Sequence, residues 1–310
     1  MKRILTTLLG ILILVFAYLL FWPTEVAPNH WKAPLNPGYT GQFATNTKLT
    51  KVDVRHLNCT ACEDVAIDSI GAVYGAAVDG RILKFQANED TPTALVNTGG
   101  RPLGLDFDTT GNLYIADANK GLLRYTTNGK LEVLSTQHND RPYLFTDDLE
   151  VSPDGRVYFT DASDHWSIHE YKFDLLEHRP AGRLLVYDPR TKQVDLLMDS
   201  LYFANGVAVA ADTSFVLVNE TSSYRTLKYW LKGDKEGQWE VFIDNLPAFP
   251  DGISRGSNGI FWLAMISPRN PIIDQLSDQP FLRKAIARLP DWAQPAPEVH
   301  AGILGINAAG

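Results

Sequence analysis

The chain has 310 residues, of which 45% are hydrophobic and 21% charged, and this composition excludes an intrinsically disordered protein. Its formal net charge of −8 argues against a nucleic-acid partner, because binding to phosphates needs a basic surface. A chain of this length can form one or two domains, and all-β architectures often use it as one.

The N-terminus predicts a membrane anchor. The stretch from Ile4 to Trp22 carries no charged residue and is long enough to cross a bilayer as a helix. Lys2 and Arg3 precede it, so the positive-inside rule leaves this short end in the cytoplasm. A cleavable signal peptide is the alternative, but no suitable cleavage site follows. We expect a cytoplasmic stub and transmembrane signal anchor over residues 1–22, with a single-pass type II topology and an extracytoplasmic globular part.

Two features lie between the anchor and the rest of the chain. Residues 23–50 are rich in Pro, Gly, Asn and Thr, which predicts a linker or a draped segment without a core of its own. Cys59 and Cys62 form a C-x-x-C pair, and no cluster of His or Cys supplies the further ligands of a zinc site. A local disulfide and a pair of buried thiols both remain open.

A repeat fills residues 51–310. In each of five segments, a short apolar strand and a turn are followed by a second strand with an aromatic residue and then by a third strand, often Gly-x-Leu-x-x-Tyr. The repeats begin at Glu63, Pro102, Asp147, Asn205 and Asp251. Strands at this spacing, with almost no amphipathic helix, predict an all-β fold built from propeller blades. The fifth repeat stops after its third strand, so we expect the propeller to be truncated in or after the fifth blade.

The third repeat contains a charged and aromatic insertion at residues 164–179, which predicts a short helix over the top of the ring. Its apolar residues either form a lid that faces a substrate or the bilayer, or pack on the upper rim of the ring. These residues are Trp166, Tyr171, Phe173, Leu175 and Leu176.

Four of the five repeat starts carry oxygen-bearing side chains. The first residue of each innermost strand of a propeller lies at the central channel, so these side chains converge. Three carboxylates and one amide are hard oxygen donors that favour calcium over magnesium or manganese, and such carboxylates repel one another unless a cation holds them. Asp and Asn also favour turns before strands, but the repeat alone does not demand acids there. We predict a calcium site formed by Glu63, Asp147, Asn205 and Asp251.

Asp64 and Asp148 directly follow two of these residues and point the opposite way in a strand. They are candidates for a second, structural calcium site. Equally, they can accept hydrogen bonds from backbone amides in the turn.

Several stretches resemble a known family. They include Asp147-Asp148-Leu149, Tyr158-Phe159-Thr160-Asp161, Asn205-Gly206-Val207, Pro250-Asp251-Gly252 and Ser267-Pro268-Arg269-Asn270. From about Phe43 onward the chain resembles the strictosidine-synthase-like branch of the calcium-dependent six-bladed β-propeller superfamily, and within it members like adipocyte plasma membrane-associated protein. That superfamily also holds gluconolactonase (regucalcin), paraoxonase and diisopropylfluorophosphatase. The resemblance implies a six-bladed β-propeller.

The resemblance also implies a calcium ion at the propeller centre. The family's Glu ligand falls on Glu63, its second Asn on Asn205 and its Asp on Asp251, whereas Asp147 stands where the family has Asn. The paraoxonase His dyad has no counterpart. The catalytic glutamate of true strictosidine synthases lies beyond Gly310, so their condensation reaction is unsupported.

Hydrolysis of a small-molecule ester or lactone is the leading hypothesis. A bound calcium ion would supply a Lewis acid, and Asp251 would act as general base on a water or attack directly. One rival is a non-catalytic binding propeller stabilised by calcium. The other is a strictosidine-synthase-like enzyme that forms a C–N bond. The natural substrate and the oligomeric state are not defined by the sequence.

Overall fold

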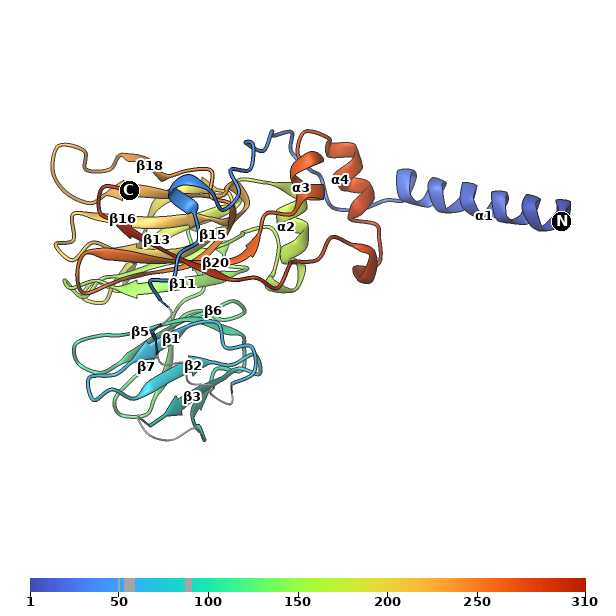
Figure 1. The fold of residues 1–310 in the computed structure, drawn as a ribbon. Helices are drawn as coiled ribbons and strands as arrows, with labels where there is room; N and C mark the ends of the chain where they lie inside the picture. The colour runs from blue at the N-terminus through green and yellow to red at the C-terminus, as the bar shows by residue number, and fades with distance from the viewer. Residues whose placement is uncertain (50, 53–58, 87–90) are drawn as a thin grey trace.

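The computed structural model describes residues 1–49, 51–52, 59–86 and 91–310, and a single long helix projects from its β-sheet body (Figure 1). This helix, α1 (Lys2–Phe21), has no buried residue. Among the described residues it is the one helix long and apolar enough to cross a membrane. Its 20 residues span about 30 Å at 1.5 Å per residue, which matches the hydrocarbon thickness of a bilayer.

Five antiparallel sheets follow, and in each of them the strands are ordered as in the sequence. The first comprises β1 (Val65–Ile67), β2 (Val73–Ala76), β3 (Arg81–Phe85) and β4 (Thr93–Asn97). The second comprises β5 (Pro102–Phe107), β6 (Leu113–Asp117), β7 (Gly121–Tyr125) and β8 (Leu131–Ser135). A hairpin of β9 (Gln137–His138) and β10 (Arg141–Pro142) leads to the third sheet, which comprises β11 (Thr146–Val151), β12 (Val157–Asp161), β13 (Gly182–Asp188) and β14 (Gln193–Leu201).

The fourth sheet comprises β15 (Ala204–Val209), β16 (Phe215–Glu220), β17 (Arg225–Trp230) and β18 (Trp239–Ile243). The fifth has three strands, β19 (Ala248–Arg255), β20 (Ile260–Pro268) and β21 (Gly302–Asn307). The strand pattern and the unfinished fifth repeat therefore match the expectation from the sequence.

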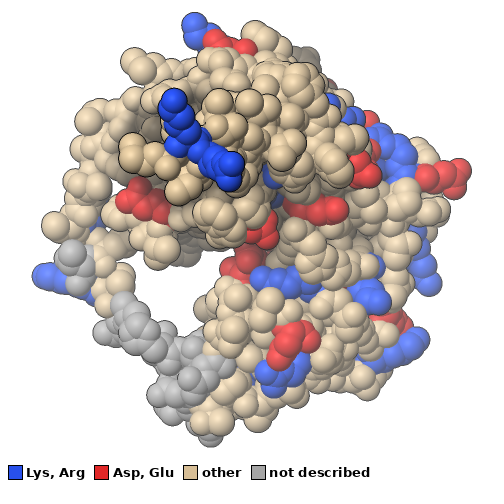
Figure 2. Space-filling model, turned by 90° about the vertical axis from the view of Figure 1, so that its right-hand side faces the viewer, with Lys and Arg blue, Asp and Glu red and all other residues tan. Residues whose placement is uncertain are grey.

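The innermost strands of the five sheets contact one another in chain order, β1 with β5, β5 with β11, β11 with β15, and β15 with β19. This arrangement is a β-propeller, which confirms the predicted fold class. Five blades are present, where the family resemblance implies six. Within the described part of the chain no comparable contact joins β19 back to β1, and Figure 2 shows an opening through the molecule beside a group of acidic side chains.

Aspartates hold the first hairpin of the early blades. In the first blade, Asp68 Oδ1 accepts hydrogen bonds from the backbone nitrogens of Ile70 (3.1 Å) and Ala72 (2.9 Å). Asp108 has the same role in the second blade. Gly71 adopts a left-handed conformation with a φ of +84°, which glycine tolerates without a steric penalty. Local turn chemistry therefore positions the first and second strands of these blades.

Carboxylates on the innermost strands join consecutive blades. Each accepts a hydrogen bond of 2.8 to 2.9 Å from a backbone nitrogen on the innermost strand of the next blade. The pairs are Asp64 with Leu105, Asp106 with Val151, Asp148 with Val207, and Glu150 with Val209. Because an innermost strand has no further strand to pair with, these carboxylates satisfy its free amides and fix the first four blades against one another.

Short helices form a layer, here called the cap, at the end of the propeller from which α1 projects (Figure 1). They are η2 (Ile168–Glu170), α2 (Tyr171–Glu177), α3 (Pro271–Gln275), α4 (Pro280–Ile286) and η4 (Asp291–Ala293). The insertion at residues 164–179 forms the expected short helix as α2, whereas α3 and α4 were not expected. The local signal for α3 is Asn270 before Pro271, since the Asn270 side chain accepts hydrogen bonds from the first turn and proline suits the first helical position.

The expected linker, residues 23–50, lies partly along the cap. The backbone nitrogen of Asn29 donates a hydrogen bond of 2.8 Å to the carbonyl of Glu177. Arg269 Nη2 donates one of 2.6 Å to the carbonyl of Pro34. Of the two forms expected from the sequence, linker or draped segment, this part of the chain adopts the draped one. The exact boundaries of the linker remain a prediction.

His178 fastens this segment to the propeller. Its imidazole lies between the rings of Trp31 and Tyr202, at centroid distances of 3.8 and 4.5 Å. Burial lowers the pKa of His178 to about 3, and the nearby charges of Arg283 and Arg225 add to the effect. The folded protein therefore holds this imidazole neutral.

Replacing Asp106 with alanine should lower the free energy of unfolding by about 1–2 kcal/mol, because the amide of Val151 loses its acceptor. Urea denaturation of the full chain in detergent, followed by tryptophan fluorescence, measures this change. Asp195→Ala, at an exposed position on β14, is the matched control and should stay within about 0.5 kcal/mol of the wild type. Equal effects of the two substitutions would contradict the role of Asp106 between blades.

Acidification should destabilise the protein partly through His178. The unfolded chain protonates this residue near its ordinary pKa of about 6.5, whereas the folded chain does so only near 3. His178 therefore contributes stability that is lost as the pH falls from about 6.5 toward 3. His178→Asn tolerates the left-handed backbone (φ 48°) and should lose stability less steeply than the wild type between pH values of about 7 and 4. Parallel slopes in urea unfolding across this range would refute the prediction.

Candidate functional site

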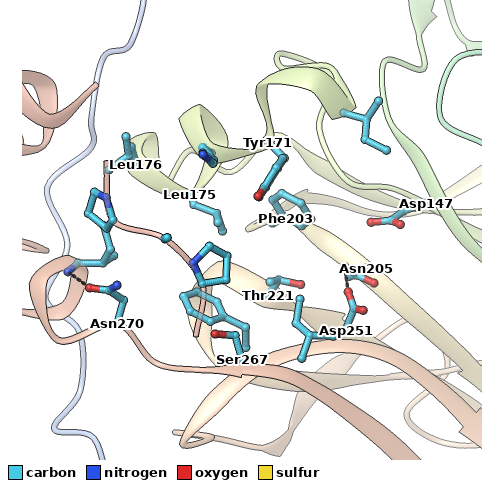
Figure 3. A pocket seen from close by; sticks show the side chains of 18 of the residues that line it. Asp147, Tyr171, Leu175, Leu176, Phe203, Asn205, Thr221, Asp251, Ser267 and Asn270 are labelled. Atoms are coloured by element: carbon cyan, nitrogen blue, oxygen red, sulfur yellow. Dashed lines mark hydrogen bonds between the residues drawn. The ribbon is translucent and has the colours of Figure 1, made fainter. Parts of the chain in front are cut away.

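The four side chains predicted to bind calcium line one cavity of about 320 Å³ between the propeller and the cap (Figure 3). Asp147 lies on β11, Asn205 on β15 and Asp251 on β19, and Glu63 lies just before β1. They come from the innermost strands of four different blades. The structure therefore brings all four together, as the repeat phase predicts.

Glycines allow these innermost strands to approach one another. A Cβ atom at Gly206, next to Asn205, would lie 2.3 Å from the carbonyl oxygen of Asp251. At Gly104 a Cβ atom would lie 2.8 Å from the Cα atom of Asp148. A side chain at either position would push the blades apart, so glycine is required for the close packing around the site.

Burial is the main cause of a raised pKa in all three carboxyl groups of the site. Asp147 is 5% exposed, and burial, then the charges of Asp251 and Glu63, raise its pKa well above the ordinary value. Burial and Glu63 raise the pKa of Asp251 to about 7. Burial also raises the pKa of Glu63, although 41% of its side chain is exposed and Arg101, 3.3 Å away, opposes the shift. A bound cation would relieve this mutual repulsion.

The hydrogen bonds of the site satisfy some of its oxygens and leave another free. Asp147 Oδ2 is buried and has no hydrogen-bond partner in the described part of the chain. Asp251 Oδ1 accepts a hydrogen bond of 2.7 Å from Asn205 Nδ2, drawn as a dashed line in Figure 3. In this conformation no three His, Cys, Asp or Glu side chains of the described residues are arranged to hold a metal ion. The oxygen donors and the unpartnered Asp147 oxygen fit a hard divalent cation, and the Asn205–Asp251 hydrogen bond uses neither Asn205 Oδ1 nor Asp251 Oδ2, so both of these oxygens can serve as ligands.

Asp64 and Asp148 line a second cavity of about 480 Å³ on the channel side of the same four residues. Both carboxylates accept the hydrogen bonds between blades described above, and Asp148 Oδ1 also accepts one of 2.8 Å from the backbone nitrogen of Leu149. Burial, then the charge of Asp64, raises the pKa of Asp148 well above its ordinary value. The hydrogen bonds support the interpretation as backbone acceptors, and a second calcium site remains a prediction.

An acidic residue ends the second strand of three blades, and its role was not predicted from the sequence. Asp117, Asp161 and Glu220 each accept a hydrogen bond from a backbone nitrogen in the segment that leads into the innermost strand of the same blade. These bonds help to set where Asp147 and Asn205 reach the channel. The available signal was an acidic residue that closes the second strand in the second, third and fourth repeats.

Two further polar residues position Asp251. Asn219 Nδ2 donates a hydrogen bond of 2.5 Å to the carbonyl oxygen of Asp251, and Thr221 Oγ1 donates one of 2.7 Å to that of Pro250. Both lie in the neighbouring fourth blade, at the end of β16 and just beyond it. Their role depends on contacts across the blade interface, so the repeat pattern contained no signal for it.

The remaining walls of the cavity are largely apolar. Aromatic and aliphatic side chains of the propeller and the cap line it, among them Leu103, Phe145, Tyr171, Leu175, Leu176, Phe203, Phe249 and Ile273. The insertion therefore contributes to the cavity, whereas its Trp166 and Phe173 pack inside the cap. A polar floor beneath apolar walls suits a small molecule with an apolar body and an oxygen-bearing group.

The sequence matches families and relatives of one kind. Residues 147–234 match the strictosidine synthase family model, and residues 41–85 match the model of the strictosidine synthase-like N-terminal region. The chain is 37% identical to Protein STRICTOSIDINE SYNTHASE-LIKE 6 of Arabidopsis thaliana, over 80% of this chain and 68% of that protein. It is 36% identical to adipocyte plasma membrane-associated protein of Bos taurus, over 91% and 72% respectively. It is 43% identical to Protein STRICTOSIDINE SYNTHASE-LIKE 13 of A. thaliana, over 62% of this chain and 48% of that protein.

Solved structures are similar in fold. A gluconolactonase of Xanthomonas campestris aligns with a TM-score of 0.56 and 17% identity, over 67% of this chain and 71% of that one. The calcium-binding protein regucalcin of Agrobacterium tumefaciens aligns with a TM-score of 0.53 and 17% identity, over 67% and 68%. At this identity the structural likeness shows the propeller fold alone. The sequence relatives, at 36% and 37% identity over more than two thirds of their own length, show the family as well. On their evidence the chain belongs to the strictosidine synthase-like family.

Proposed function

We propose that this protein is a calcium-dependent hydrolase of esters or lactones. The observation that carries the proposal is the convergence of Glu63, Asp147, Asn205 and Asp251 on the floor of a largely apolar cavity. The buried, unpartnered oxygen of Asp147 supports a cation at this point. Two proteins that share the propeller fold are named a gluconolactonase and a calcium-binding protein, so this fold is compatible with the proposed activity and with the proposed metal.

Each residue of the floor has a stated role in this proposal. Glu63, Asp147 and Asn205 would hold the cation, and Asp251 would lie between the cation and the reacting group. When bound, calcium supplies a Lewis acid for the carbonyl oxygen and positive charge for the oxyanion. Asp251 takes a proton from the attacking water as general base, or attacks the carbonyl carbon itself. Asn219 holds the backbone carbonyl of Asp251 and so keeps the carboxylate in place.

We infer that the propeller lies on the extracytoplasmic side of a membrane, in a single-pass type II orientation. The apolar helix α1 and the relative named as membrane-associated support anchoring in a membrane. Lys2 and Arg3 favour a cytoplasmic N-terminus. The disulfide between Cys59 and Cys62 supports an oxidising compartment such as the periplasm, the lumen or the exterior.

A non-catalytic propeller stabilised by calcium is the second candidate. The hydrogen bonds by which acidic side chains join consecutive blades favour it, because a cation held by the neighbouring acids would likewise tie the blades together. The match to the strictosidine synthase model raises C–N bond formation as a third. Among the described residues that line the cavity, however, the one glutamate is Glu63, which the proposal assigns to the cation.

Asp251→Asn and chelation of calcium should each abolish hydrolysis of aryl esters and lactones by the full chain in detergent. We expect kcat/KM to fall at least 100-fold in the variant, since a general base contributes about 10² to 10⁴. Activity after chelation should return when calcium is added back. Asp195→Asn is the control and should retain the activity of the wild type. Turnover that survives both treatments would reject the mechanism, and calcium-dependent stability without any turnover would favour the binding propeller.

Asp147→Asn should weaken calcium binding about tenfold, or about 1.4 kcal/mol, because it removes one negative charge from the donor set. Isothermal titration calorimetry of the full chain measures the affinity. The thermal midpoint should rise with calcium more for the wild type than for Asp147→Asn. Asp195→Asn again serves as the control, and an unchanged calcium affinity in Asp147→Asn would place the cation elsewhere.

A further inference from the structure

The outer surface of the cap exposes large apolar side chains. Trp292 is 87% exposed and Phe281 54%, and Ile272 and Leu282 are exposed as well. These four residues are called the cap face below. Large apolar groups gathered on one exposed layer mark a site of contact with a partner or a membrane.

Arg288 ties the cap to the end of the membrane helix. Its Nη1 donates a hydrogen bond of 2.8 Å to the carbonyl of Leu19, and its Nε donates one of 2.6 Å to the carbonyl of Trp22. The hydroxyl of Tyr18 donates one of 3.2 Å to the carbonyl of Arg288. The guanidinium thus satisfies carbonyls that the end of a helix leaves free.

These contacts set the height of the cap relative to the bilayer. Leu19 belongs to the last turn of α1 (Lys2–Phe21), and this helix is the candidate membrane span. Residues close to Arg288 along the chain, including Trp292, are therefore held at the level where the span leaves the hydrocarbon. Tryptophan prefers this interfacial level, and the guanidinium of an arginine can reach the headgroups from it.

The elements that carry the cap face also line the cavity. On α3, Ile272 is exposed while Ile273 lines the cavity. At η4, Trp292 is exposed, and Gln294 just beyond it lines the cavity. Figure 2 looks at this side of the molecule with α1 pointing toward the viewer, and the side chains around the helix are mostly uncharged. The cavity therefore lies directly behind the surface that faces the membrane.

We propose that the cap face rests in the surface of the bilayer that α1 crosses, and that the cavity takes an ester or lactone with a hydrocarbon chain from that bilayer. The contact with the bilayer stands on the cap alone, whereas the substrate class rests on the proposed function. The apolar walls receive the chain, and the polar floor receives the carbonyl group. Burial of the cap face adds to the anchoring by α1.

Spin labels test the contact with the bilayer. The full chain is placed in lipid nanodiscs as Phe281→Cys, Trp292→Cys and, for control, Val133→Cys, which is exposed on β8. Cys59 and Cys62 form a disulfide and do not react with the label. The ratio of accessibility to oxygen over that to a water-soluble nickel complex should be severalfold higher at 281 and 292 than at 133. Equal ratios at all three positions would overturn the proposal, as would labels at 281 and 292 that are shielded from both reagents by protein.

A series of esters tests the substrate class. Esters with one leaving group and acyl chains of increasing length are offered to the wild type in nanodiscs. We expect kcat/KM to rise by up to about fourfold per added methylene until the cavity is filled. A flat or falling series would overturn the preference for a hydrocarbon chain. Absence of turnover on every ester of the series and on lactones would overturn the proposed function and the substrate class that rests on it, while the spin labels still decide the membrane contact.

Discussion

The stability of the propeller depends on interactions that offset the cost of burying acidic side chains around its axis. An unpaired buried carboxylate costs several kcal/mol, and four of these side chains avoid that cost by accepting an amide of the next blade. The same hydrogen bonds hold the innermost strands of the second, third and fourth blades against the blade before each of them. A second set of acids, Glu63, Asp147 and Asp251, occupies the neighbouring positions without such backbone partners from the next blade. The bonds of the first set join the blades that carry Glu63 and Asp147, while Asn219 and Thr221 hold the segment around Asp251. A cation would offset the burial of these three carboxyl groups.

The cap connects this centre to α1, the candidate membrane span. Segments far apart in the sequence form the cap. In the draped segment, the backbone nitrogen of Asn29 donates a hydrogen bond to the carbonyl of Glu177, the last residue of α2. Arg288 joins the cap to the end of α1. The cavity therefore has the propeller axis as its floor and the cap, which is bonded to the end of α1, as its roof. The anchor thus helps to place the candidate site, because the site opens beneath the elements that the anchor holds.

Most of the propeller could be predicted because each blade forms from local signals. Asp68 and Gly71 specify a hairpin within a few residues of chain, and the apolar alternation of the strands repeats at every blade. The helices α3 and α4 could not be predicted in the same way, because elements of five and seven residues are too short to show a helical period. Their apolar residues have partners only in the assembled cap, so the local signals for them were Asn270 before Pro271 in α3 and Pro280 at the start of α4.

The sequence by itself determined the anchor helix, the repeating blades and the four residues at the blade starts, since charge, hydrophobic pattern and repeat phase are all local or periodic properties. It also offered both uses of Asp148, as a metal ligand and as a backbone acceptor. Only the tertiary structure decided that this carboxylate bonds the amide of Val207, that Asn219 and Thr221 hold the segment around Asp251, and that Asn205 bonds Asp251 directly. A hydrogen bond between blades forms only if the donor and acceptor are placed to within a few tenths of an ångström. That placement exists only once the innermost strands have packed.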